Sequence, residues 1–134
     1  MTKQLAEVMA IVNRTPDSFY DKGATFASEK ALLRIDGAVS AGASIIDVGG
    51  VKAGPGGDVD VAEEIDRVVP LIAAARGRHP DVTLSVDTWR APVAEAAIAA
   101  GADLINDTWA GFDPELVEVC LLYTSDAADD SLRV

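Results

Sequence analysis

The chain has 134 residues, of which 49% are apolar and 25% are charged. This length supports one hydrophobic core, and the composition is typical of a folded globular domain. The formal net charge of −11 argues against nucleic acid or an anionic membrane as a partner, because phosphate groups would repel the chain. No apolar run approaches the roughly 20 residues that a membrane-spanning helix needs. A single cysteine, Cys120, excludes an internal disulfide framework and indicates a reducing, cytoplasmic location.

The first predicted strand ends in a group of polar residues. Residues 9–12 (MAIV) form a short apolar run that a sheet would bury, and the six residues after it are NRTPDS. An amide, a guanidinium, hydroxyls and a carboxylate therefore follow directly after a buried strand. Residues 29–41 then carry apolar side chains at helical spacing. We predict a helix there, with Ser28 as its N-cap and Gly42 just beyond its end.

A second strand and a second helix follow in the same order. Residues 44–48 (SIIDV) indicate a buried strand, which leads into the glycine-rich loop GGVKAGPGG. The second helix is expected to begin with Asp60 as its N-cap, because DVAE matches the capping-box pattern and an apolar stripe runs from Val61 to Ile72. Pro70 lies inside this helix and is expected to kink it.

The rest of the chain repeats this alternation. Residues 82–86 predict a third strand, Pro92 suits the first turn of a helix that ends near Gly101, a fourth strand begins at 104–105, and the dipeptide 113–114 opens a fourth helix. The segments AGASIIDV and AGADLIND share a helix end, a tight glycine turn and an apolar strand with a polar end. Because helices separate the strands, the strands must run parallel with right-handed crossovers.

Two parallel α/β folds fit this alternation, an open doubly wound sheet and a (β/α)₈ TIM barrel. Polar residues at successive strand ends favour the barrel, which gathers its active site from the C-terminal ends of its strands. A doubly wound sheet would concentrate such residues at one switch point. The residues predicted at these strand ends are Asn13, Asp47, Asp87, Asn106 and Asp107.

The chain is expected to hold only about the first half of such a barrel. A complete barrel needs roughly 250 residues, and the predicted strand–helix units account for residues 1–119. Beyond residue 119 the helical pattern fails and no fifth strand follows, so we expect 120–134 to be a non-native or disordered tail. A half-barrel has two open parallel edges and an uncovered interior, so we also expect the chain to fold poorly alone.

Four motifs carry a family resemblance. NRTPDSFYDKG, DVGG…GPGG, SVDT and AGADLINDTWAG occur in this order in dihydropteroate synthases, so residues 8–119 resemble the N-terminal half of such an enzyme. The combination is specific, whereas any one motif alone would be a modest signal. The resemblance implies a Mg²⁺-dependent transferase of folate biosynthesis that joins 6-hydroxymethyl-7,8-dihydropterin diphosphate to 4-aminobenzoate and releases pyrophosphate. We expect the full-length protein to be a homodimer.

The loop after the first strand is the candidate catalytic segment. Pyrophosphate leaves readily only when its charge is neutralised, and Mg²⁺, which prefers oxygen ligands, can do this. The side-chain carbonyl of Asn13 can supply one such oxygen, and the resemblance assigns Asn13 a role at the metal and the diphosphate. Asp17 and Ser18 could order around the same ion, although a Pro-Asp-Ser turn is equally typical of a surface loop.

Asp87 and Asn106 are the candidate pterin-binding residues. The pterin ring presents an exocyclic amine and a ring N–H side by side, and a carboxylate such as Asp87 accepts both in a fork. Asn106 offers a donor and an acceptor for the remaining edge of the ring. The resemblance assigns both residues to the pterin pocket, although in isolation they could equally cap a turn and satisfy loop backbone. Asp47 and Asp107 are interpreted as structural partners of the site.

The second loop departs from the family pattern. Typical members read GGESTRPG where this chain reads GGVKAGPGG, which removes the family's Thr and Arg contacts near the diphosphate and the aminobenzoate. Lys52 is a candidate substrate-binding residue, because it could restore a positive charge, though without the planar fork of an arginine. Arg90 lies on the side of the site and could meet phosphate, although it is interpreted here as an unpaired surface cation. His79 is interpreted as a solvated loop residue.

Three hypotheses for function remain open. The first is a divergent dihydropteroate synthase. The second is a pterin-binding relative that has lost the synthase reaction and acts as a binding or partner subunit, and the altered second loop favours it. The third is a methyltetrahydrofolate-dependent methyltransferase domain, and the NRTPDSFYD loop argues against it.

Overall fold

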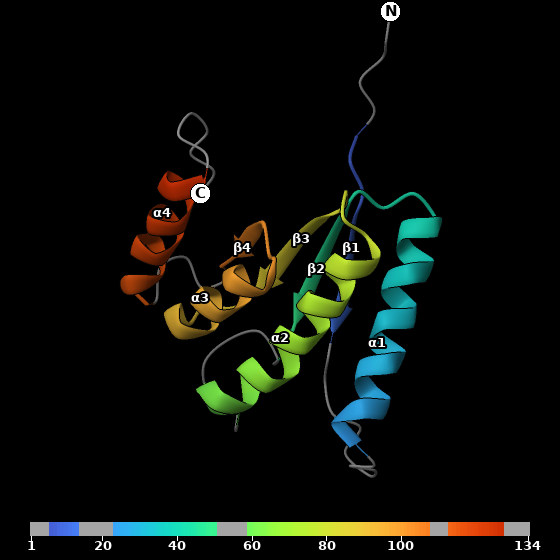
Figure 1. Cartoon of the computed structure of the whole chain (residues 1–134), viewed down its shortest axis with the longest axis horizontal. Coiled ribbons are helices and arrows are strands. Elements are labelled where there is room, and N and C mark those ends of the chain that lie inside the picture. Colours follow the sequence, from blue (N-terminus) through green and yellow to red (C-terminus); the bar gives the residue numbers. More distant parts are fainter. Residues whose placement is uncertain (1–5, 14–22, 51–58, 108–112, 128–134) are drawn as a thin grey trace, which may run out of the picture.

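The computed structural model describes residues 6–13, 23–50, 59–107 and 113–127, and its strands and helices alternate along the chain (Figure 1). This arrangement confirms the predicted α/β class. The elements are β1 (Met9–Asn13), α1 (Gly23–Ser40), β2 (Ile45–Gly49), α2 (Val61–Arg78), β3 (Thr83–Asp87), α3 (Ala91–Ala100), β4 (Leu104–Asn106) and α4 (Glu115–Ala127). Among the described helices, none is long and apolar enough to cross a membrane.

The four strands form one parallel sheet in the order β1-β2-β3-β4. Each strand lies beside its neighbour in sequence, so each crossover moves the chain one position in the same direction. A doubly wound sheet reverses this direction at its switch point, whereas a TIM barrel does not. The strand order therefore agrees with the predicted first half of a barrel.

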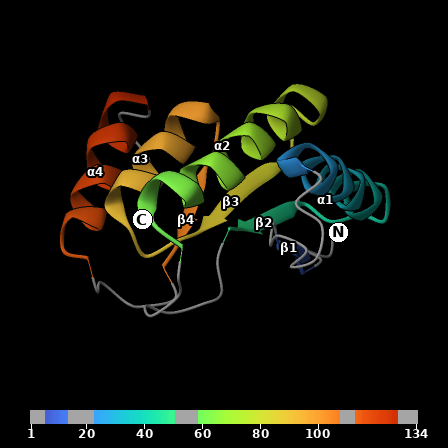
Figure 2. The ribbon, with the colours of Figure 1, turned by 90° about the horizontal axis from the view of Figure 1, so that it is seen from below.

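The described helices lie on one face of the sheet, and Figure 2 shows them arched over the strands on that side. On this face Val12, Ile46, Val48, Leu84 and Val86 are buried against Ile35 of α1 and Val68, Leu71 and Ile72 of α2. Side chains alternate between the two faces of a strand, so the residues between these apolar positions point to the opposite face, which would be the interior of a barrel. Opposite the helices, Met9 and Ile11 are 42% and 68% exposed.

We expect the chain alone to self-associate rather than unfold as a cooperative monomer. The described sheet ends in two parallel edges, β1 and β4, and Ile11 exposes apolar surface on the interior face. Unpaired edges and exposed apolar faces promote aggregation. Analytical ultracentrifugation and calorimetry of the 134-residue chain would check this. A sharp two-state melt at monomer mass would show that four strand–helix units are sufficient for a stable fold.

Most predicted boundaries agree with the structure, and two helices extend further than expected. Asp60 caps α2 as predicted, because its side chain accepts a hydrogen bond from the Glu63 amide at 2.8 Å. α1 begins at Gly23, so Ser28 lies inside the helix and the predicted N-cap is wrong. No proline interrupts residues 23–28, so the helix propagates towards the N-terminus from its packed part. α2 continues through Pro70.

The last described helix crosses the boundary that we expected at residue 119. α4 runs from Glu115 to Ala127, so the helical pattern does not fail where the sequence suggested. Leu116 is buried against Ala91 and Ala94 of α3, and this contact fixes the start of α4 on the neighbouring helix. Whether residues 120–134 are native to the chain stays a prediction.

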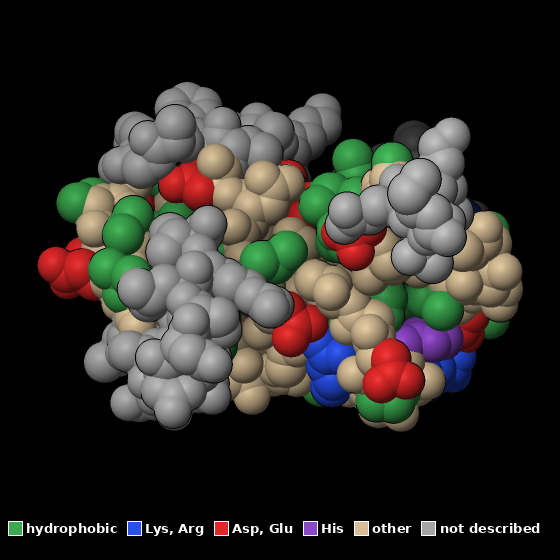
Figure 3. Space-filling model, turned by 90° about the horizontal axis from the view of Figure 1, so that it is seen from above, with side chains coloured by type: hydrophobic (Ala, Val, Ile, Leu, Met, Phe, Trp, Pro, Cys, Tyr) green, Lys and Arg blue, Asp and Glu red, His purple; other side chains and the backbone are tan. Residues whose placement is uncertain are grey.

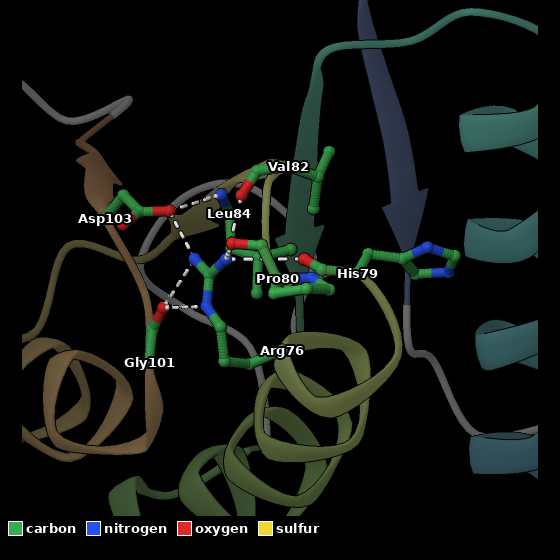
Figure 4. A network of polar contacts seen from close by, with 7 residues as sticks. All are labelled: Arg76, His79, Pro80, Val82, Leu84, Gly101 and Asp103. Carbon is green, nitrogen blue, oxygen red and sulfur yellow. Dashed lines mark hydrogen bonds and ion pairs between the residues drawn. The ribbon is translucent and has the colours of Figure 1, made fainter.

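Arg76, near the end of α2, binds the turns that precede β3 and β4 (Figure 4). Its guanidinium donates to the carbonyl of Gly101 from Nε and Nη2, at 3.1 and 2.9 Å, and to the carbonyls of Pro80 and Val82, at 3.0 and 2.9 Å. It also pairs with Asp103, whose carboxylate accepts a hydrogen bond from the Leu84 amide. These contacts lie at the N-terminal ends of the strands. In TIM barrels, residues at this end stabilise the fold, and catalytic residues lie at the C-terminal ends.

In a complete barrel that contains this chain, replacing Arg76 with alanine should lower the free energy of unfolding by about 2–4 kcal/mol, because the part-buried carbonyl contacts of Gly101 and Val82 lose a charged donor. Arg78→Ala is the matched control: the Arg78 side chain is 52% exposed and, among the described residues, its one ion pair is with Asp36, so its loss should cost less than about 1 kcal/mol. Urea denaturation of both variants would check this. Equal losses would contradict the structural role of Arg76.

His79 is not the solvated loop residue that the sequence suggested. Its Nε2 lies 2.7 Å from Asp36 Oδ1, and its side chain is 18% exposed. The hydrogen bond with His79 lowers the pKa of Asp36, and the nearby charge of Arg78 acts in the same direction. Figure 3 looks onto this end of the molecule, where basic, histidine and acidic side chains gather. α1 and α2 are thus joined by polar contacts as well as by apolar packing.

Candidate functional site

The polar residues at the strand ends form one row across the sheet. Asn13 is in register with Gly49, Gly49 with Asp87, and Asp87 with Asn106. Residues in register on neighbouring parallel strands point to the same face. This face is the one opposite the helices, because Val12, Val48 and Val86, which precede the first three members of the row, are buried against the helices.

Gly49 leaves space between the side chains of Asn13 and Asp87, two of the candidate site residues. A Cβ atom at this position would lie 3.3 Å from Asn13 Oδ1 and 3.8 Å from Asp87 Oδ2. The side chains of Asn13 and Asp87 therefore flank the glycine, and a larger residue there would crowd Asn13. Asn13 is exposed, and Asp87 and Asn106 are half-buried, so the described residues do not seal the row. Asn13, Asp87 and Asn106, which the sequence predicted at successive strand ends, thus lie on one face of the sheet, and their roles in binding stay predictions.

Asp47 lies one step deeper on the same face and is 2% exposed. It accepts a hydrogen bond from Ser85 Oγ at Oδ1, over 2.7 Å, and one from Asn106 Nδ2 at Oδ2, over 3.3 Å. Asp47 thus contacts Asn106, a member of the row, from a position deeper in the sheet. Its contacts agree with the interpretation of a structural partner. Asp107 follows β4 directly and is half-buried.

Two arginines hold the backbone on either side of the second loop. Arg67 Nη1 donates to the carbonyl of Gly50 at 2.9 Å, and Arg90 Nη2 donates to the carbonyl of Val59 at 2.8 Å. Arg90 also forms an ion pair with Glu64, whose side chain is fully buried, at 2.9 Å. Its guanidinium lies 4.6 Å from the centre of the Trp89 ring. The interpretation of Arg90 as an unpaired surface cation is therefore wrong.

Glu64 and Arg67 were not singled out from the sequence. Glu64 is in phase with Val68, Leu71 and Ile72, three of the four buried apolar residues of α2. An acidic residue in phase with a buried stripe signals a paired internal charge, because burying a lone carboxylate is costly. This signal was present in the sequence and would have predicted a cationic partner for Glu64.

Three of the candidate site residues lie outside the described residues. Asp17 and Ser18 belong to the first loop and Lys52 to the second, and their predicted roles stay predictions. In the part of the chain that the structure describes, no three His, Cys, Asp or Glu side chains form a metal-binding group. Mg²⁺ often takes only one or two protein ligands and completes its shell with water and substrate phosphates. The exposed amide of Asn13 fits that limited role.

Comparison with known proteins identifies the family. A family model described as pterin-binding enzyme matches residues 9–126. The chain belongs to the dihydropteroate synthase family. It is 66% identical over 114 residues to the inactive dihydropteroate synthase 2 of Mycobacterium tuberculosis, a match that covers 85% of this chain and 36% of the relative.

Solved dihydropteroate synthases share the fold of the chain. The 7,8-dihydropteroate synthase of Vibrio fischeri superposes with a TM-score of 0.77 at 43% identity, over 87% of this chain and 42% of that one. The Burkholderia cenocepacia synthase, solved as a complex with 7,8-dihydropteroate, superposes with a TM-score of 0.72 at 38% identity, over 89% and 39% of the two chains. The chain therefore spans less than half the length of these family members.

Proposed function

We propose that this chain forms the N-terminal half of a reduced-pterin pocket in a dihydropteroate synthase relative that binds the pterin without performing the condensation. The observation that supports this most directly is the row Asn13–Gly49–Asp87–Asn106, with polar side chains on either side of a glycine. A carboxylate and an amide on neighbouring strands suit a flat ring that is rich in N–H groups.

In this proposal each residue of the row contacts a different part of the ligand. Asp87 accepts the exocyclic amine and the adjacent ring N–H, and Asn106 contacts the neighbouring edge. Asn13, at the exposed end of the row, faces the diphosphate and supplies one oxygen to a Mg²⁺ ion that the diphosphate carries. When bound, Mg²⁺ neutralises the charge of the pyrophosphate group. Lys52 would add a positive charge from the second loop.

Two observations support the loss of the condensation. The second loop reads VKAG where typical members carry Glu, Ser, Thr and Arg, so the contacts near the diphosphate and the aminobenzoate are replaced. The Mycobacterium tuberculosis relative, at 66% identity, is named an inactive synthase.

Synthase activity is the second candidate function, because the Vibrio fischeri relative at 43% identity is named a synthase. In that case the arylamine nitrogen of 4-aminobenzoate attacks the methylene carbon that carries the diphosphate. The C–N bond forms, the C–O bond breaks, pyrophosphate leaves and the nitrogen loses a proton. The full-length protein would then be a homodimer that takes both substrates.

The test uses the chain continued by the C-terminal half of the Mycobacterium tuberculosis relative, here called the extended chain, so that an incomplete barrel is not mistaken for a defective site. Calorimetry with 6-hydroxymethyl-7,8-dihydropterin diphosphate and Mg²⁺ should show binding, and addition of 4-aminobenzoate should release no pyrophosphate. Absence of binding would refute the pocket. Pyrophosphate release that depends on 4-aminobenzoate would instead establish the second candidate, the synthase.

A further inference from the structure

Asp47 is a buried carboxylate that the proposed pocket does not itself use. Both of its oxygens are engaged, Oδ1 by Ser85 and Oδ2 by Asn106, and the residue is 2% exposed. It lies two residues before Gly49 in β2, on the same face as Asp87 and Asn106. Its contact with Asn106 has a consequence for the hydrogen bonds that the row can make.

The contact with Asp47 sets which way round the Asn106 amide lies. A carboxylate accepts hydrogen bonds and donates none, so the amide nitrogen must face it. The reverse orientation would place the amide oxygen against a carboxylate oxygen with no hydrogen between them. Within the described part of the chain, the Asn106 side chain makes this one hydrogen bond. Its Oδ1 is therefore left as an acceptor on the side away from Asp47.

We propose that Asp47 is a positioning residue that fixes Asn106 as a hydrogen-bond acceptor towards the bound ring. This inference rests on the proposed function and narrows its ligand class. Asp87 is also an acceptor, so two neighbouring side chains together require a ligand edge made of N–H donors. In a 2-amino-4-oxopteridine the fork of Asp87 takes one amine N–H and the ring N–H, and the second N–H of the exocyclic amine is left for Asn106 Oδ1, whereas the carbonyl edge would meet two acceptors. The pocket therefore selects flat heterocycles by an amidine-like or guanidine-like donor edge.

An exchange of the two side chains tests this proposal in the extended chain. Asp47→Asn keeps the shape of the residue and an acceptor for Ser85, but it presents N–H groups to Asn106. The Asn106 amide should then turn its oxygen towards position 47, and dihydropterin affinity should fall about tenfold. Asn106→Asp places two carboxylates side by side and should weaken binding at least as much. In the double variant the amide at position 47 donates to the carboxylate at position 106. This restores a hydrogen bond between the two positions and leaves an acceptor towards the ligand.

The double variant should bind dihydropterin within about threefold of the unchanged protein, because the two substitutions compensate each other. A carboxylate at position 106 cannot donate a hydrogen bond. Recovery of dihydropterin binding in the double variant therefore excludes a role of Asn106 as a donor to the ring. If the double variant loses as much dihydropterin affinity as the two single variants lose together, the proposal is overturned. If the unchanged extended chain binds no dihydropterin, the proposed function itself fails, and this inference fails with it.

A second measurement needs neither ligand nor substitution in the row. In the extended chain, the side-chain amide signals of Asn13 and Asn106 are assigned in a nitrogen-15 NMR spectrum. The Asn106 pair should exchange with water more slowly than the Asn13 pair, because Nδ2 donates to a buried carboxylate and Asn13 is exposed. Equal exchange of the two pairs would overturn the orientation of Asn106.

Discussion

Replacing Asp87 with alanine should abolish measurable binding of a dihydropterin to the extended chain. A carboxylate that accepts two neighbouring N–H groups contributes about 1.5–3 kcal/mol per charge-assisted hydrogen bond. Loss of both bonds should therefore weaken binding by about two to four orders of magnitude. Isothermal titration calorimetry with 6-hydroxymethyl-7,8-dihydropterin diphosphate measures this directly.

Two control variants distinguish the loss of the two Asp87 hydrogen bonds from a general loss of negative charge. Asp87→Asn keeps the size of the side chain but can accept only one of the two N–H groups, so it should also bind poorly. Asp66→Ala removes the same charge from an exposed position on α2 and should leave the affinity unchanged. Unchanged affinity in Asp87→Ala would refute the assignment of this residue to the pterin.

Replacing Arg90 with alanine should lower the free energy of unfolding of the extended chain by about 3–5 kcal/mol, because it leaves the buried charge of Glu64 without its partner. Glu64 Oε1 accepts from Arg90, and Oε2 has no hydrogen-bond partner among the described residues. The same substitution also removes the donor to the Val59 carbonyl. Urea denaturation monitored by far-ultraviolet circular dichroism would measure the loss.

A neutral side chain at position 64 provides the decisive comparison. With Glu64→Gln already in place, Arg90→Ala should cost only about 1–2 kcal/mol, because no charge is left unpaired. Arg67→Ala should cost a similar amount, because its ion-pair partner Glu63 is 51% exposed and screened by water. If Arg90→Ala costs no more than Arg67→Ala, water reaches Glu64 and the pair is not buried in solution.

The features of the fold that could be predicted from the sequence are those that depend on short stretches. Short stretches rich in apolar residues located the first three strands, the pair Leu104-Ile105 located the start of the fourth, and Asp60, Pro92 and the glycines Gly42 and Gly101 located helix ends. Both glycines have positive φ, 107° and 123°, which a side chain would strain. The strand ends then placed Asn13, Asp87 and Asn106 in one row, because parallel strands in register bring their C-terminal ends together.

The pairings that the sequence did not predict join residues far apart in the chain. Arg90 and Glu64 are separated by 26 positions, and His79 and Asp36 by 43. Which charged side chains meet depends on how the helices pack, and spacing within one helix does not contain that information. The same limit applies to Arg76, whose several partners lie in two turns. The roles of Asp17, Ser18 and Lys52 stay predictions, because these residues lie outside the described ranges.

The position of Arg76 has a consequence for how relatives of this chain can diverge. Its guanidinium ties two crossovers together at the end of the sheet remote from the Asn13–Asn106 row. The scaffold is thus stabilised at one end of the sheet, and the candidate site residues lie at the other end. Relatives can therefore change the sequence of the loops at the candidate-site end, and can even lose enzymatic activity, while they retain the same fold.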